Sequence, residues 1–211
     1  MSKLHSIKEQ TYEIIKNKIL TQEFPLGSRI NIGELSRELS VSNSPIREAL
    51  SQLEKQGLVI TTRNSGTNVV SLSLRDRYEH AQMLLFLMLG AYDYCRASGR
   101  TGKLIEKMEP VLARQKEFFA VQAVYEYTEQ ATGFDRCIIE ATDNQYLLDL
   151  FDDQAPLFFL GSLFGHQEGE SDWLVSMRQH EVILRAIKNG DHALVMETLR
   201  AHYYKPVWDL R

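Results

Sequence analysis

Hydrophobic residues recur at helical spacing in three segments near the start of the chain. Isoleucines at positions 7, 14, 15 and 19 follow the 3.6-residue period and predict a helix over residues 5–21. The stretch Pro25-Leu26-Gly27 ends this helix, because proline and glycine together favour a turn. The same periodicity predicts shorter helices over residues 32–39 and 43–56, and the second of these stops at Gly57.

The pattern changes after Gly57 from helical to strand-like. β-branched residues are frequent in residues 58–62 and 67–71, which predicts two strands, and Arg63-Asn64-Ser65-Gly66 between them has the composition of a turn. Three helices followed by a β-hairpin is the element order of a winged helix-turn-helix. We therefore predict that residues 1–71 form a winged helix-turn-helix domain.

From residue 72 onward the hydrophobic pattern is helical, with no strand-like segment. Interruptions with glycine and polar residues lie at residues 98–99, 165–172 and 189–190. The chain is therefore expected to be mainly α, with residues 72–211 forming an all-helical bundle of six helices. The predicted spans are residues 73–98, 103–118, 123–141, 144–164, 171–189 and 191–209.

Composition restricts the class of protein. The 211 residues are 44% hydrophobic and 25% charged, as in ordinary globular proteins. No stretch supplies the roughly 18 consecutive apolar residues that a membrane helix needs, and the first residues lack the apolar run of a secretory signal. Cys95 and Cys137 have neither metal-binding nor redox spacing. We expect a cytoplasmic protein with no membrane partner.

The net charge of −4 is unevenly distributed. Residues 1–70 contain nine Lys and Arg against seven Asp and Glu, a net charge of +2, whereas the remainder carries −6. A slightly basic N-terminal domain on an acidic body is compatible with DNA binding through one end of the protein.

The predicted third helix carries the residues best suited to read DNA. Ser42 precedes this helix and is expected to cap it. Asn43, Ser44 and Arg47 lie in its first two turns, and in a helix-turn-helix this end of the second helix enters the major groove. We therefore expect these three side chains to contact base edges or phosphates. Arginine is suited to bidentate contact with guanine.

Two further arginines extend this expected DNA surface. Arg37, on the preceding helix, is placed for a phosphate contact, and Arg63, in the same turn as Gly66, is placed for the DNA backbone or minor groove. The alternative is that Arg47 is an ordinary surface residue on a capped helix. The succession of helix, helix, tight turn, helix with an early arginine, and hairpin favours DNA binding.

These residues resemble the GntR family of bacterial regulators. The resemblance runs from Pro25-Leu26-Gly27-Ser28-Arg29-Ile30 through Ser42–Leu50 and Gly57-Leu58-Val59 to Gly66, about the first third of the chain. The family usually has arginine where this chain has Asn43. The resemblance therefore implies one altered base contact, and asparagine is a natural partner for adenine.

The remainder of the chain resembles the helical effector domain of the FadR-type branch, the FCD domain, in its shorter VanR-like form with six helices. The matching residues are His180–Ile187, Gly190-Asp191 and His202, with Phe134-Asp135 and Ala141–Asn144 earlier in the domain. This resemblance implies a homodimeric regulator, more commonly a repressor. Its affinity for double-stranded operator DNA would be controlled by a small-molecule effector such as an organic acid.

The resemblance also implies a metal site. Many FCD domains hold a divalent metal with one Asp and three His inside the bundle. By position, this chain keeps His180 and His202, has Asp135 in place of one His, and has Ala131 where the Asp would be. Two imidazoles and one carboxylate remain, a set that zinc, nickel or iron accepts with open positions. A carboxylate effector would complete the coordination shell.

Effector contacts are expected from Asp135, His180 and His202 and from two other residues. Family members commonly carry an effector-facing arginine on the first helix of this domain, where this chain has Gln82, and Arg178 is the cation nearest His180 in sequence. Residues 83–89 of that first helix are apolar on nearly all sides. This pattern predicts burial on more than one side, in the core and against a second subunit.

Three alternatives stay open from the sequence. Without a metal, His180 and His202 would simply form hydrogen bonds to Asp135 or to an anionic ligand. A metalloenzyme would use the same three residues with a bound water. A constitutive DNA-binding protein would use the helical domain for dimerisation alone.

Overall fold

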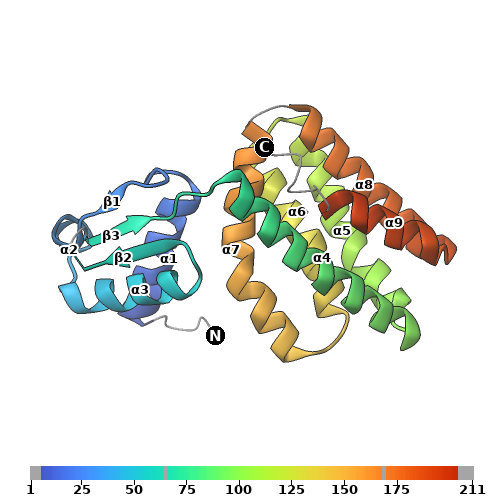
Figure 1. The fold of residues 1–211 in the computed structure, drawn as a ribbon, viewed down its shortest axis with the longest axis horizontal. Helices are drawn as coiled ribbons and strands as arrows, with labels where there is room; N and C mark the ends of the chain where they lie inside the picture. Colours follow the sequence, from blue (N-terminus) through green and yellow to red (C-terminus); the bar gives the residue numbers. More distant parts are fainter. Residues whose placement is uncertain (1–5, 64–65, 168–169, 204–211) are drawn as a thin grey trace. The chain divides into compact units, whose positions relative to one another are not determined.

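A computed structural model describes residues 6–63, 66–167 and 170–203 of the chain. The chain divides into two compact units, Met1–Leu72 and Ser73–Arg211 (Figure 1). The first unit contains three helices and a small sheet, and the described part of the second is helical. The prediction of a mainly α chain with a winged helix-turn-helix before an all-helical domain is confirmed.

The first unit has the helices and the hairpin that the pattern predicts, and one strand that it does not. The sheet is antiparallel in the order β1-β3-β2, and β1 pairs with β3 through Arg29 opposite Asn68. A two-residue strand is too short to produce a recognisable alternation, so the sequence did not predict it. The elements are α1 (Ile7–Leu20), β1 (Arg29–Ile30), α2 (Ile32–Leu39), α3 (Asn43–Lys55), β2 (Val59–Thr62) and β3 (Gly66–Val69).

Local hydrogen bonds define where α1 and α2 begin. Ser6 and Glu9 form a capping box, in which each side chain accepts a hydrogen bond from the other residue's backbone N–H, at 3.2 and 2.8 Å. Asn31 Oδ1 accepts from the backbone of Gly33 and Glu34 at the start of α2. The predicted first helix began at residue 5, which lies outside the described residues.

The tight turn between α2 and α3 depends on Ser40, which adopts a left-handed conformation with φ 53°. Ser36 closes the turn by accepting from Val41 N at 3.2 Å through its backbone oxygen and donating to Val41 O at 2.6 Å through its hydroxyl. This turn fixes the direction in which α3 leaves α2. The buried residues of the unit include Ile15, Ile19, Leu35, Ile46, Leu53 and Leu58.

The described part of the second unit is a bundle in which α6 contacts α4, α5, α7 and α8 (Figure 1). The predicted eight-residue interruption at 165–172 is shorter in the structure, because α7 continues to Gln167 and α8 begins at Glu170. The predicted last helix extended to residue 209, and residues 204–209 lie outside the described part. The helices are α4 (Leu74–Ala97), α5 (Thr101–Ala120), α6 (Val124–Glu140), α7 (Gln145–Gln167), α8 (Glu170–Asn189) and α9 (His192–Tyr203).

Helix α4 is buried on one side of the bundle and exposed on another. Leu84, Leu85 and Met88 are buried in the hydrophobic core, whereas the side chain of Phe86 is 66% exposed. The sequence predicted that residues 83–89 are buried on more than one side, and within the single chain this burial is only partial. Among the described residues, no helix is both long and apolar enough to span a membrane.

Candidate functional site

Helix α3 has a buried apolar face and an exposed polar face at its N-terminal end. Ile46, Ala49, Leu50 and Leu53 are buried against the rest of the first unit. Asn43, Ser44 and Arg47, the residues predicted to contact base edges or phosphates, are all exposed. Because the apolar face is fixed in the core, the polar face has a defined direction rather than a mobile one.

The Ser42 cap differs from the prediction. Ser42 occupies the N-cap position of α3 with extended backbone, φ −68° and ψ 168°, but its side chain makes no capping hydrogen bond. Ser44 instead forms a long hydrogen bond, 3.5 Å, to Glu48 Oε1, and Lys8 Nζ lies 3.2 Å from Glu48 Oε2. Ser42, Asn43 and Ser44 are exposed at this helix N-terminus, a position where proteins bind anions such as phosphate.

Exposed arginines also lie on other elements of the same unit. Arg37 of α2 is exposed, and its Nε donates to Gly33 O at 3.3 Å. Arg63 is exposed where β2 ends. Gly66 begins β3 with φ +78°, a conformation that glycine adopts without strain.

Arg29 is a candidate DNA-contacting residue that the sequence analysis did not select. Its exposed side chain comes from the edge strand β1 and packs against the hairpin at Gly66, where an added Cβ would lie 3.4 Å from Arg29 Nη2. This arrangement puts a second guanidinium beside the turn that contains Arg63. The missed signal was the pairing of β1 with β3, which brings Arg29 to the wing.

The second unit brings together three residues that the sequence analysis proposed as metal ligands. Asp135 of α6, His180 of α8 and His202 of α9 each offer a ligand atom, and these atoms all lie within 4.8 Å of one another. Asp135 and His180 are buried, and His202 is half-buried. Residues separated by up to 67 positions in sequence therefore form one compact polar cluster inside the bundle.

Burial controls the charge of this cluster. Loss of hydration raises the pKa of the Asp135 carboxyl from 3.8 to about 7, and the nearby Tyr203 hydroxyl offsets part of this rise. Asp135 in turn adds to the burial effect that raises the pKa of Tyr203. The buried Tyr203 hydroxyl lies close enough to the Asp135 carboxyl to affect its pKa, but the two groups are not aligned as a regular hydrogen bond. A divalent cation would compensate a carboxylate that is otherwise costly to ionise.

The chemistry of the cluster fits a metal, but with one ligand fewer than the resembled family. Ala131 lies one turn before Asp135 on α6 and belongs to a buried apolar group with Tyr127 and Trp173. Position 131, where the resembled family has its Asp ligand, therefore provides no carboxylate in this chain. The donor set is thus two imidazoles and one carboxylate, which leaves coordination positions open on zinc, nickel or iron.

The two other proposed effector residues lie at the surface of the second unit. Gln82 of α4 and Arg178 of α8 are both exposed. Arg178 is two residues before His180, and this spacing places the two side chains on different faces of α8. The geometry brings Asp135, His180 and His202 together and leaves the roles of Gln82 and Arg178 as predictions.

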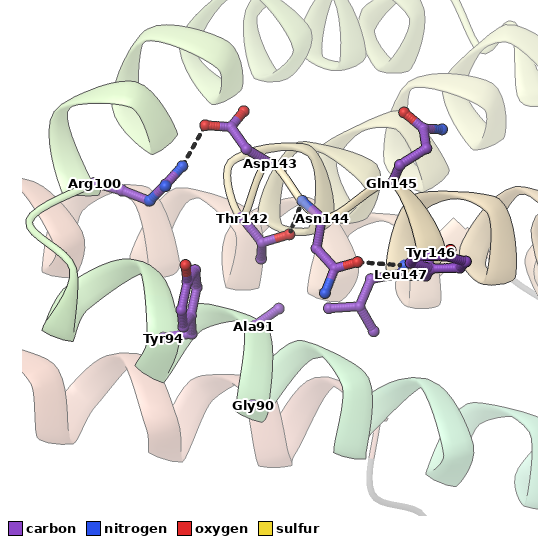
Figure 2. Close-up of a pocket in the computed structure, with 10 residues that line it drawn as sticks. All are labelled: Gly90, Ala91, Tyr94, Arg100, Thr142, Asp143, Asn144, Gln145, Tyr146 and Leu147. Carbon is purple, nitrogen blue, oxygen red and sulfur yellow. Dashed lines mark hydrogen bonds and ion pairs between the residues drawn. The ribbon is translucent and has the colours of Figure 1, made fainter.

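An open cavity of about 600 Å³ lies elsewhere in the second unit, between α4 and the turn that joins α6 to α7 (Figure 2). In this turn Thr142 Oγ1 accepts from Asn144 N at 3.1 Å, and Asn144 Oδ1 accepts from Leu147 N at 3.2 Å, so Asn144 caps α7. Arg100 pairs with Asp143 at one end of the cavity. Residues 141–144 belong to the sequence resemblance, but the sequence did not predict a cavity beside them.

Comparison with known proteins agrees with the architecture. The profile of "Bacterial regulatory proteins, gntR family" matches residues 7–69, and that of the "FCD domain" matches residues 96–205. The HTH-type transcriptional regulator YdhC of Bacillus subtilis is 24% identical over 207 residues, which cover 92% of this chain and 86% of YdhC. The gluconate operon transcriptional repressor of the same organism is 24% identical over 207 residues, covering 96% of this chain and 84% of the repressor.

Solved structures share the fold at lower identity. A GntR transcriptional regulator from Rhodococcus sp. RHA1 superimposes with a TM-score of 0.81 at 16% identity, covering 94% of each chain. E. coli McbR/YncC superimposes with a TM-score of 0.71 at 15% identity, again covering 94% of each chain.

The two profiles fall in the two units of the chain, and the gntR-family profile and the relatives are of transcriptional regulators, which decides against the metalloenzyme alternative. The protein binds DNA through its N-terminal helix-turn-helix, as this family does. This chain belongs to the GntR family of bacterial transcriptional regulators, in the branch whose C-terminal part is an FCD domain.

Proposed function

We propose that the protein is a cytoplasmic, homodimeric repressor that binds a two-fold symmetric operator and responds to an organic acid bound in its helical domain. The observation that carries this proposal is the orientation of α3. Its apolar side is fixed in the core and its leading polar side chains, Asn43, Ser44 and Arg47, are exposed. A helix held in this way can enter a major groove without rearrangement.

Base contacts and phosphate contacts divide among different residues. Arg47 suits bidentate contact with guanine O6 and N7, and Asn43 suits adenine N6 and N7. Ser42 and Ser44 lie at the helix N-terminus, where hydroxyl and backbone N–H groups suit a phosphate. Arg37 and Arg63 add positive charge on neighbouring elements of the unit, which strengthens binding without selecting sequence.

Dimerisation is proposed through the exposed apolar side of α4 in the second unit. Phe86 and Tyr94 are 66% and 49% exposed and lie two turns apart on that helix, while Gly90 between them has open space at its Cβ position. Exposed apolar side chains of this size favour a protein partner. A two-fold symmetric dimer would present two copies of α3 to two half-sites.

We place the effector and metal functions at the cluster of Asp135, His180 and His202, with Gln82 and Arg178 as further candidate effector contacts. A divalent zinc, nickel or iron ion bound by the three residues would keep positions open for a carboxylate. Relatives named as gluconate operon repressors support a carboxylate effector, because gluconate is itself a carboxylate. An effector that binds one arrangement of the dimer more tightly than another would change operator affinity.

Selection of binding sites from a randomised DNA library tests the DNA-binding part of the proposal. The full chain should enrich one sequence with two-fold symmetry and half-sites about one helical turn apart. Sedimentation with and without that DNA should show two chains, and Phe86→Glu should shift the free protein to monomers. Failure to enrich any sequence would contradict specific operator recognition.

The response to effectors is tested with the selected DNA. Sugar acids and other small carboxylates are added with and without a chelator, and operator affinity is measured by fluorescence anisotropy. A metal-dependent loss of affinity with one class of acid supports the proposal. Affinity that is insensitive to every acid favours the constitutive alternative, in which the helical domain serves dimerisation alone.

A further inference from the structure

Both histidines of the cluster are held in the same way by a glutamine side chain. His180 Nδ1 lies 2.8 Å from Gln115 Oε1, and His202 Nδ1 lies 2.8 Å from Gln179 Oε1. The first pair joins α8 to α5, and the second joins α9 to α8. The same ring nitrogen is therefore occupied in both imidazoles.

The chemistry of the amide decides which nitrogen carries the proton. An amide oxygen has lone pairs and no hydrogen, so it accepts and does not donate. A short contact from this oxygen to Nδ1 requires Nδ1 to be the donor. In a neutral imidazole with hydrogen on Nδ1, the lone pair suited to a metal lies on Nε2.

The rings are also restrained by packing, which limits rotation out of this arrangement. The His180 ring stacks on Phe134 with centroids 4.2 Å apart and an interplanar angle of 14°. The ring centroids of His180 and His202 are 4.8 Å apart, and those of His202 and Tyr203 are 4.7 Å apart with the two rings nearly perpendicular. Neighbouring aromatic side chains and glutamines thus fix both position and orientation.

We infer that Gln115 and Gln179 are positioning residues that hold His180 and His202 with hydrogen on Nδ1, so that both Nε2 atoms join Asp135 as ligands of one divalent cation. The inference rests on the proposed metal site and adds the residues that prepare it. Metal-binding histidines generally donate their second ring N–H to an acceptor, and loss of that acceptor typically weakens metal binding by about 10- to 100-fold.

The two glutamines are not equivalent. Gln115 is fully buried on α5. Its burial makes its amide difficult to replace by water, whereas Gln179 is half-buried and lies nearer to solvent. Replacement of Gln115 should therefore have the larger effect, because water can substitute for the Gln179 amide more readily.

Cobalt binding to the full chain tests the inference. The affinity for Co²⁺ is measured by competition with a chromophoric chelator, and the visible absorption of bound Co²⁺ reports the ligand geometry. Gln115→Leu should weaken Co²⁺ binding by about 10- to 100-fold and Gln179→Leu by about tenfold, and both should alter the cobalt spectrum. Gln115→Glu, which keeps an acceptor oxygen, should recover most of the affinity and spectrum lost in Gln115→Leu.

A second histidine–glutamine pair in the same unit provides a matched control. His80 Nε2 lies 3.3 Å from Gln154 Oε1, and neither residue belongs to the cluster. Gln154→Leu should therefore leave both the affinity for Co²⁺ and the spectrum unchanged. If Gln115→Leu does not fold by circular dichroism, Gln179→Leu against Gln154→Leu provides the same comparison.

Nitrogen NMR of the metal-free protein gives a readout that needs no metal. In ¹⁵N-histidine-labelled chain, His180 and His202 should show hydrogen on Nδ1, and each glutamine replacement should disturb that state. Hydrogen on Nε2 in both rings, or unchanged Co²⁺ affinity in both glutamine variants, would overturn this inference while leaving the metal site intact. Absence of Co²⁺ binding by the unchanged protein would overturn the metal site itself.

Discussion

Replacement of Asp135 by asparagine should remove most of the pH dependence of stability of the helical unit. The side chain is 3% exposed, and burial raises the pKa of its carboxyl from 3.8 to about 7. Asparagine keeps nearly the same shape and cannot ionise. The change therefore isolates the cost of placing a negative charge at this position.

Proton linkage determines the direction and the magnitude of this change in the free energy of unfolding with pH. Between pH 4 and pH 7 the folded protein keeps a proton on Asp135 that the unfolded chain has already released, so the free energy of unfolding falls as pH rises. A difference of about three pKa units corresponds to a loss of about 4 kcal/mol by pH 8, with little further loss above that pH. His180, His202 and Tyr203 face the carboxyl, so the charge states of the two histidines modify the lower part of this range.

Tryptophan fluorescence allows the measurement on the helical unit within the full chain. The only two tryptophans of the sequence, Trp173 and Trp208, both belong to the second unit. Urea unfolding followed by this signal, in the presence of a chelator, gives the free energy of unfolding at each pH. The unchanged protein should lose stability from pH 4 to pH 8, whereas Asp135→Asn should give a much flatter curve.

Added Zn²⁺ extends the same experiment. At pH 8 a bound cation should restore stability to the unchanged protein and give much less to Asp135→Asn, because the carboxylate is one of its three ligands. Parallel curves of stability against pH for the two proteins in chelator would show that burial does not control the charge of Asp135.

Three further changes test the first unit. Gly66→Ala should destabilise the wing by about 1 kcal/mol in thermal unfolding, because alanine at φ +78° is strained, and an unchanged midpoint would contradict this. Arg29→Ala should leave folding intact and reduce the slope of log affinity against log salt by about one unit, whereas an unchanged slope would remove Arg29 from the DNA surface. Leu53→Ala, at a fully buried position, should cost the first unit about 2–5 kcal/mol while the urea midpoint reported by Trp173 stays the same.

The elements that sequence predicted well are those with local signals. Helix α3 has hydrophobic residues at helical spacing and a glycine after its end, and these features act within a few residues of each other. Strand β1 was missed because two residues cannot show a period, and its place depends on pairing with β3. The side-chain cap expected at Ser42 is absent, which shows that a residue type suits a position without fixing its hydrogen bond.

In the polar cluster, too, the sequence predicted some residues and missed others. Asp135, His180 and His202 were selected through the resemblance to FCD domains, and the structure brings their ligand atoms together. Gln115 and Gln179 were not selected, since glutamines occur in many surroundings and have no spacing that marks them as partners of histidine. Gln115 is 65 residues from His180, so only the packing of α5 against α8 reveals the pair.

Contact between base pairs and the leading polar side chains of α3 is tested by the affinity of Arg47→Ala for the selected operator and for every single-base variant of it. Arg47→Ala should bind the operator about 1–3 kcal/mol more weakly and lose discrimination at one position in each half-site. Arg114→Ala, an exposed arginine of α5, should bind as the unchanged protein does. Full discrimination at every position by Arg47→Ala would contradict the assignment of α3 as the helix that reads DNA.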